Sequence, residues 1–67
     1  MRISYNKLWK MLIDKNMKKS DLKEKAGISS ASLAKLGKGD NITTDVLLHI
    51  CEVMDCRIED ILETVRD

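Results

Sequence analysis

The scarcity of residues that interrupt helices is the feature that most constrains how this chain can fold. Its 67 residues include no proline and only three glycines, at positions 27, 37 and 39. Apolar residues recur every three or four positions along most of the chain, the spacing that gives a helix one buried face. Because few positions can interrupt such helices, the pattern favours an all-α fold over short strands joined by turns.

The apolar spacing predicts five helices and no sheet. They cover residues 5–15, 19–25 and 30–36, a fourth segment from about 44 to 54, and residues 58–65. A chain this short buries only about 60% of the surface that it exposes when unfolded, so we expect residues 1–67 to form a single domain around one core. The predicted core residues are Leu8, Met11, Leu12, Leu22, Ala26, Ile28, Leu33, Leu36, Leu47, Ile50, Cys51, Met54, Ile58, Ile61, Leu62 and Val65.

Small polar residues and glycines mark the predicted helix ends. A hydroxyl oxygen just before a helix can accept a hydrogen bond from a first-turn amide, and the predicted N-caps of this kind are Ser4, Ser29 and either Thr43 or Thr44. Gly27 is expected to close the second helix in an open turn that suits glycine. Gly37 and Gly39 are expected to end the third helix.

Charge is divided along the chain. Residues 1–39 contain ten Lys and Arg against three Asp and Glu, a net charge of +7, whereas residues 40–67 contain two against eight, a net charge of −6. A basic half is the electrostatic footprint of a polyanionic partner, and an acidic half keeps the opposite face away from it. The alternative is that the basic side chains are only solvated, or that the two halves neutralise one another.

Two short helices joined by a turn that contains Gly27, over about residues 19–36, form the pattern of a helix-turn-helix motif. Apolar residues hold the two helices at a fixed angle, so the exposed face of the second helix is free to enter the major groove of DNA. That groove is about 12 Å wide and presents base edges that side chains can recognise. The small residues 29–32 permit close approach, and Lys35 is the one long donor on the same face.

Residues 19–29 (KSDLKEKAGIS) and 33–39 (LAKLGKG) resemble the Cro/C1-type, Xre-like family of helix-turn-helix DNA-binding proteins. Residues 47–56 (LLHICEVMDC) and 58–62 (IEDIL) are similar to the fourth and fifth helices of that family. The resemblance covers about residues 5–65. It implies a five-helix, phage-repressor-like fold and a transcriptional regulator, typically a repressor, that binds double-stranded operator DNA as a homodimer.

The resemblance also assigns DNA-contacting roles to positions of this chain. The positions that match base-reading residues of the family are Ser30, Ala31 and Lys35. The positions that match its phosphate-holding residues are Lys19, Lys38, Asn41 and Thr43. With Ser29 and Ser32, which permit close approach at the start of the same helix, these residues form the predicted DNA interface.

No catalytic residue, metal site, cofactor or small-molecule ligand is expected, so the chain is predicted not to be an enzyme. His49 and Cys51 diverge on one helix, and neither a nucleophile nor a glycine-rich phosphate loop accompanies His49. Cys51 and Cys56 are expected to be separate buried thiols, because five residues along a helix place them roughly 140° apart, which is unfavourable for a disulfide.

No apolar run reaches the roughly 18 residues of a membrane span, and residues 1–4 lead into a charged helix, not the apolar core of a signal peptide. We therefore expect a cytoplasmic protein with no membrane partner.

Two classes of function remain open. The first is the DNA-binding regulator, which the charge division favours. The second is a protein-interaction module on the same fold, including an antitoxin-like partner-binding protein, which stays open because the reading face lacks Arg, Gln and Asn. Trp9 and Ile13 form an apolar pair that either is exposed to a partner or packs against Ile61 and Val65.

Overall fold

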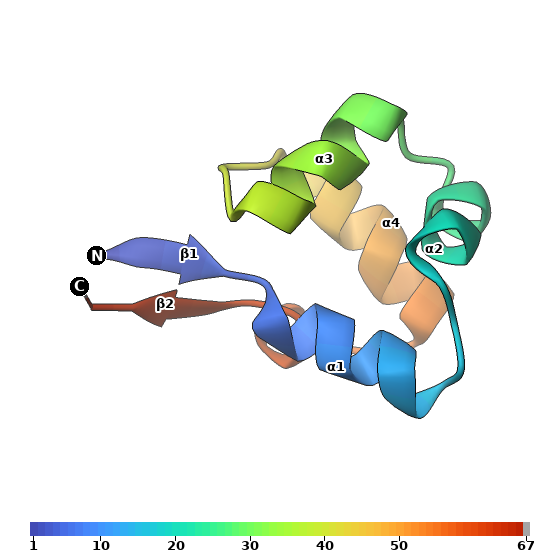
Figure 1. Cartoon of the computed structure of the whole chain (residues 1–67), viewed down its shortest axis with the longest axis horizontal. Coiled ribbons are helices and arrows are strands. Elements are labelled where there is room, and N and C mark those ends of the chain that lie inside the picture. Colours follow the sequence, from blue (N-terminus) through green and yellow to red (C-terminus); the bar gives the residue numbers. More distant parts are fainter. Residues whose placement is uncertain (67) are drawn as a thin grey trace.

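The computed structural model describes residues 1–66 of the chain. Over that range four α-helices follow one another: α1 (Asn6–Asp14), α2 (Lys19–Ala26), α3 (Ser30–Lys38) and α4 (Thr44–Met54). A 3₁₀ turn, η1 (Ile58–Asp60), comes next, and two short strands, β1 (Arg2–Ser4) and β2 (Glu63–Val65), lie near the two ends. Figure 1 shows the helices gathered into one body, from which the two paired strands extend. The structure is mostly helical, so the all-α fold that the sequence predicts is confirmed only in part.

The core takes side chains from every helix. Its most deeply buried members, each less than 2% exposed, are Leu8, Leu22, Leu36, Ile50 and Ile61. Burying one such side chain contributes about 1.5–3 kcal/mol, so these five positions account for much of the folding free energy of so small a chain. Helix α2 packs against both α3 and α4, which fixes the angle of the helix-turn-helix pair.

A few core predictions differ from the structure. Leu33 and Val65 are half-buried outside the core cluster, and Ile58 is 39% exposed. Tyr5, which was not among the predicted core residues, is only 3% exposed and belongs to the core.

Two of the three predicted N-caps are confirmed. The Ser29 hydroxyl accepts a hydrogen bond from the Ser32 amide at 3.1 Å, and the Thr43 hydroxyl accepts one from the Val46 amide at 3.3 Å. The Ser4 prediction is wrong, because α1 begins one residue later, after Tyr5. Ser4 belongs to β1 instead, and its hydroxyl accepts a bond from the Asn6 amide at 3.3 Å where the strand meets the helix.

The glycine predictions are only partly correct. Gly27 and Gly39 adopt the left-handed conformation, with φ of 64° and 75°, and close α2 and α3. Gly37 does not end α3, since the helix continues through it to Lys38. One internal glycine costs about 1 kcal/mol relative to alanine, which is too little to stop a helix that Gly39 can close two residues later.

The predicted fifth helix over residues 58–65 is wrong. Only Ile58–Asp60 form a helical turn, and Glu63–Val65 then pair antiparallel with β1, with Arg2 opposite Val65 and Ser4 opposite Glu63. A helix of about eight residues is marginal by itself. Pairing with β1 satisfies backbone groups of both strands, and Ile61 still reaches the core. The prediction of no sheet fails with the helix.

The cysteine prediction is also wrong in its geometry. Helix α4 ends at Met54, and Asp55 takes a left-handed conformation (φ 52°) that turns the chain back. The Cys56 amide then donates to the Cys51 carbonyl at 3.1 Å, a helix-ending arrangement that brings these two side chains together. Both are half-buried free thiols. Burial, followed by the neighbouring Cys51, raises the pKa of Cys56 to about 11.

Candidate nucleic-acid interface

The helix-turn-helix unit is α2, a three-residue turn and α3. Leu22 and Ala26 on α2, Ile28 in the turn, and Leu36 on α3 are all buried. These contacts fix one face of α3 against the body of the protein. The opposite face of α3 lies at the surface, where a partner can reach it.

The exposed face of α3 carries small residues and two lysines. Of the residues predicted to contact bases, Ser30, Ala31 and Lys35 are all exposed, and Lys38 is exposed near the helix end. Within residues 1–66, the Ser30 hydroxyl and the Lys35 ammonium have no hydrogen-bond or ion-pair partner, so both are available to a ligand. The structure therefore brings the three base-reading candidates onto one accessible surface.

Sequence reasoning missed two positions of this surface. Ala34 and Gly37 are exposed on α3 as well, because the helix runs on to Lys38. The helical period was the signal that could have found Ala34, since it lies two residues from the buried Leu36 and so faces away from the core.

Two of the serines predicted to lie in the interface are hydrogen-bonded to one another. The Ser29 hydroxyl donates to the Ser32 hydroxyl at 3.1 Å while it accepts from the Ser32 amide. Ser29 is exposed and Ser32 is half-buried. Their first role is therefore to begin α3 and so to set the position of Ser30 and Ala31.

The predicted phosphate-holding residues lie at the surface on both sides of α3. Lys19 begins α2, and Asn41 and Thr43 follow α3 in the loop before α4; all three are exposed. The Thr43 oxygen caps α4, and the hydrogen of the same hydroxyl remains a possible donor. At the start of α2, the Asp21 carboxylate accepts a hydrogen bond from the Lys18 amide at 3.0 Å, so one acidic side chain lies in the first turn of the helix that Lys19 begins.

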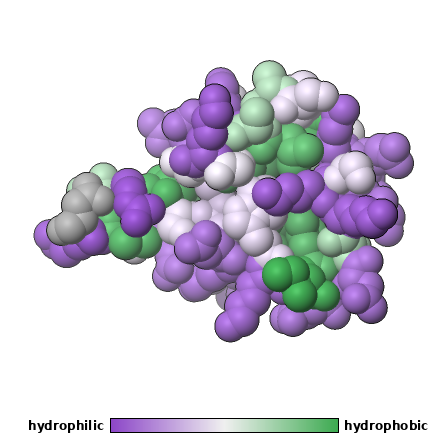
Figure 2. Space-filling model, viewed as in Figure 1, coloured by the Kyte–Doolittle hydropathy of each residue, from purple (hydrophilic) through white to green (hydrophobic). Residues whose placement is uncertain are grey.

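The Trp9 side chain on α1 contacts the start of α2. The Lys19 ammonium lies 4.5 Å from the centre of the Trp9 ring, within the range of a cation–π interaction. Trp9 is half-buried, whereas Ile13 is 74% exposed, so the structure separates the two members of the apolar pair. Figure 2 shows an apolar patch on the surface over α1 among hydrophilic neighbours.

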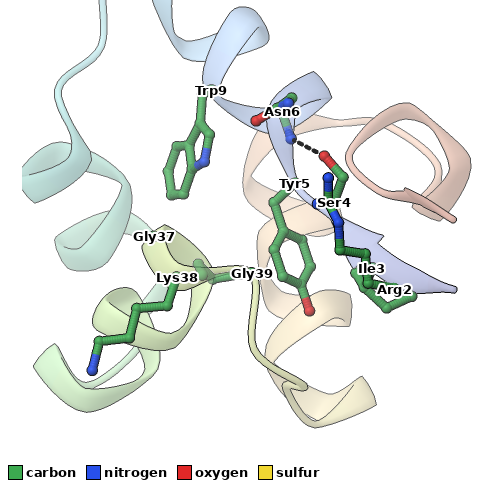
Figure 3. Close-up of a pocket in the computed structure, with 10 residues that line it drawn as sticks. Arg2, Ile3, Ser4, Tyr5, Asn6, Trp9, Gly37, Lys38 and Gly39 are labelled. Atoms are coloured by element: carbon green, nitrogen blue, oxygen red, sulfur yellow. Dashed lines mark hydrogen bonds between the residues drawn. The ribbon is translucent and has the colours of Figure 1, made fainter. Parts of the chain in front are cut away.

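A pocket of about 200 Å³ lies between β1 with the start of α1 and the end of α3. Its walls include Asn6 and Trp9 on one side and Gly37, Lys38 and Gly39 on the other. Figure 3 shows the ring of Trp9 extending from α1, and the ring of Tyr5 extending from the residue just before α1, toward residues 37–39. The Tyr5 hydroxyl donates to the Asp40 carbonyl at 3.0 Å, which ties this loop to α1.

No three His, Cys, Asp or Glu side chains of residues 1–66 gather where a metal ion could bind. Over the same residues, no helix combines the length and the apolar character that a bilayer crossing requires.

A buried helix pair that presents the face of its second helix, with lysines at both ends, defines a helix-turn-helix DNA-binding domain. The chain belongs to the Cro/C1-type helix-turn-helix DNA-binding domain family, whose model matches residues 7–67. The crystal structure of transcriptional regulator VanUg is similar to it throughout, with a TM-score of 0.95 and 52% sequence identity over 98% of this chain and 88% of that chain. None of the curated proteins compared with the chain matches it.

Proposed function

We propose that this protein is a sequence-specific transcriptional regulator that inserts α3 into the major groove of double-stranded DNA and acts as a repressor by occupying its operator. The observation that carries the proposal is the exposed face of α3, where small side chains surround the unpartnered Lys35. The family supports DNA binding, and the similarity to VanUg, a transcriptional regulator, supports the regulatory role. Because such a protein acts where the DNA is, we place it in the cytoplasm. We also propose that it binds its operator as a homodimer.

The roles within the interface follow from side-chain chemistry. Lys35 combines reach with charge and suits the O6 and N7 acceptors of guanine, while Ser30 can donate a short hydrogen bond and the Ala31 methyl can contact a thymine methyl. Lys19 and Lys38 neutralise phosphates, and Asn41 and Thr43 donate hydrogen bonds to them. Phosphate contacts orient the domain, and the α3 face selects the sequence.

The salt dependence of binding tests the phosphate contacts. Each neutralised phosphate makes log K fall by roughly 0.9 per decade of salt, so Lys19→Ala is expected to weaken binding to all duplexes alike and to flatten the slope by about one unit. The measurement is a titration of fluorescent duplexes at several salt concentrations. An affinity that does not change with salt would contradict the proposal.

Selection of binding sites from random duplexes at moderate salt tests sequence recognition. A good base contact is worth about 1–3 kcal/mol of discrimination, so Lys35→Ala is expected to relax the preference at one base step per half-site. Lys38→Ala serves as the matched control, because it removes the same charge from a phosphate contact and should leave the selected sequence intact. If Lys35→Ala leaves that sequence unchanged, Lys35 contacts the DNA backbone instead.

The protein-interaction alternative rests on the exposed apolar side chains of Ile13, 74% exposed, and Leu48, 54% exposed. Apolar side chains at the surface favour a protein partner. A protein that selects no duplex sequence but retains a protein partner through these residues would establish that alternative.

A further inference from the structure

Gly37 is the glycine that the fold does not explain. Gly27 and Gly39 have the positive φ values that favour glycine, whereas Gly37 lies inside α3 without one. A methyl group at position 37 would meet nothing within 4 Å. Alanine would therefore fit and would favour the helix, since glycine is the poorer helix former. A glycine that is costly to the fold at an open surface position suggests that another molecule approaches the backbone there.

Trp9 lies opposite Gly37 across the pocket and holds a lysine. Its ring extends from α1 toward residues 37–39, with the ring nitrogen on the side that faces Asn6 and Tyr5 (Figure 3). The Lys19 ammonium, 4.5 Å from the ring centre, is attracted to the ring face. Because this contact restrains an otherwise exposed lysine, Trp9 limits the conformations that Lys19 must give up when it binds an anion.

The groups around the pocket suit an anion. Lys38 is part of its wall, and its ammonium, which points away from Trp9 and Tyr5 in Figure 3, must turn to reach an anion there. Lys19 lies over the Trp9 ring, and the Asn6 amide and the Trp9 indole N–H are further donors. None of the described residues that form its walls is acidic. Burial, and then the negative charge of Asp40, raise the pKa of Tyr5, so Asp40 is the opposing charge near this pocket. The space of about 200 Å³ equals that of several water molecules at about 30 Å³ each, so a phosphate group fits.

We propose that this pocket seats one phosphate of the DNA backbone, with Gly37 as the point of close approach, Lys38 as its counter-charge and Trp9 as a positioning residue that holds Lys19 toward the adjoining backbone. The inference rests on the proposed function and deepens it, because it adds a contact made by α1 to those made by α2, α3 and the loop after α3. The contact involves phosphate alone, so it strengthens binding to every sequence equally.

Gly37→Ala is the decisive variant, because it is expected to raise the stability of the fold and to lower the affinity for DNA. Its urea midpoint is expected to rise, since alanine is the better helix former. Its affinity for random-sequence duplexes is expected to fall about tenfold, because the added methyl group keeps the phosphate from approaching the backbone. A variant that is more stable and binds duplex DNA as tightly as the unaltered protein would overturn the proposal.

Trp9 supplies an independent measurement, because it is the one tryptophan of the chain. Its fluorescence is expected to change as duplex DNA fills the pocket. Trp9→Leu and Lys19→Ala are expected to be non-additive in affinity, since Trp9 acts through Lys19, whereas a merely structural role for Trp9 would give additive effects.

Lys38→Gln, with Lys7→Gln as its charge-matched control, provides a second test that leaves Gly37 in place. The Lys7 ammonium bonds to the Glu59 carbonyl at 3.2 Å, outside the pocket. Lys38→Gln should flatten the salt slope by about one unit more than Lys7→Gln.

The outcomes separate this inference from the proposed function. Duplex binding detected by a labelled duplex, with unchanged Trp9 fluorescence and an unchanged affinity of Gly37→Ala, would overturn the inference and leave the proposed function standing. Failure of the unaltered protein to bind any duplex would overturn both.

Discussion

Tyr5 shows how much one side chain contributes to the shape of the interface. It is almost completely buried beside α1, yet its hydroxyl reaches the Asp40 carbonyl 35 positions away in the sequence. The contact holds the loop that follows α3, and that loop carries Asn41 and leads to Thr43. A core residue therefore sets where the predicted phosphate contacts lie.

Removing this hydroxyl tests the connection. Tyr5→Phe keeps the ring and loses one hydrogen bond, so the free energy of unfolding should fall by about 0.5–1.5 kcal/mol in urea titrations. Burial, and then the negative charge of Asp40, raise the pKa of Tyr5 above its ordinary value of 10.0. The folded protein therefore holds the phenolic proton to higher pH than the unfolded chain, and this stability is lost as pH rises above 10.0.

Tyr5 is the one tyrosine of the chain, so the ultraviolet absorbance of tyrosinate follows it directly. Tyr5→Phe should lose less stability between neutral and alkaline pH than the unaltered protein. Lysine side chains titrate in both proteins, so the difference between them reports on Tyr5 alone. A native tyrosinate midpoint at or below 10.0 would contradict the assigned environment.

At the scale of elements, the sequence predicts correctly those features that depend on neighbouring residues alone. The order of the four helices, the Ser29 and Thr43 caps and the turn at Gly27 all depend on residues within a few positions of one another. The segment 58–65 was mispredicted because its apolar spacing suits a helix, whereas its strand depends on pairing with β1 at the other end of the chain. The contact of Cys51 with Cys56 was missed because it depends on a left-handed Asp55, which no spacing rule reveals.

The same reasoning applies to the candidate interface. Family resemblance brought forward the residues that lie on the exposed face of α3, and sequence periodicity alone could have added Ala34. Trp9 and Gly37 could not be found in this way, because their relation arises only when α1 packs near the end of α3. Sequence spacing carries no information on that contact.

Ser29 links an element to the function proposed for it. Ser29→Ala removes the cap of α3 and should cost about 1 kcal/mol of stability, whereas Ser29→Asp replaces the cap with an equally good one and should retain stability. Ser29→Asp also adds a negative charge next to the reading face, so it should weaken duplex binding. Urea unfolding and duplex titration of both variants measure the two effects. Unimpaired binding by Ser29→Asp would place Ser29 outside the interface.

At the scale of the whole molecule, the division of charge follows the structure. The lysines of α2 and α3 lie on the helix-turn-helix unit, and α4, η1 and β2 carry exposed acidic residues, among them Glu52, Glu59 and Glu63. An acidic surface away from the interface repels DNA, so it favours one orientation of the domain on the duplex. Trp9, Ile13, Leu48 and Val53 are apolar residues that the sequence offers for a subunit interface. Trp9 and Val53 pack against the core, whereas Ile13 and Leu48 are exposed.

Those two residues are the candidates for contact between copies of the chain. One copy measures 32 × 24 × 17 Å, which is comparable to the roughly 34 Å between half-sites on successive turns of DNA, so two copies can bind side by side. We expect a homodimer on a palindromic duplex, with sedimentation giving two chains per duplex.

Leu48→Glu and Ile13→Glu, tested separately, should fold normally because both side chains are exposed. The variant at the interface should bind as a single copy with lower affinity. Thr64→Glu, on the exposed part of β2, is the matched control and should keep the dimer. A single copy on the palindromic duplex for the unaltered protein would refute the homodimer.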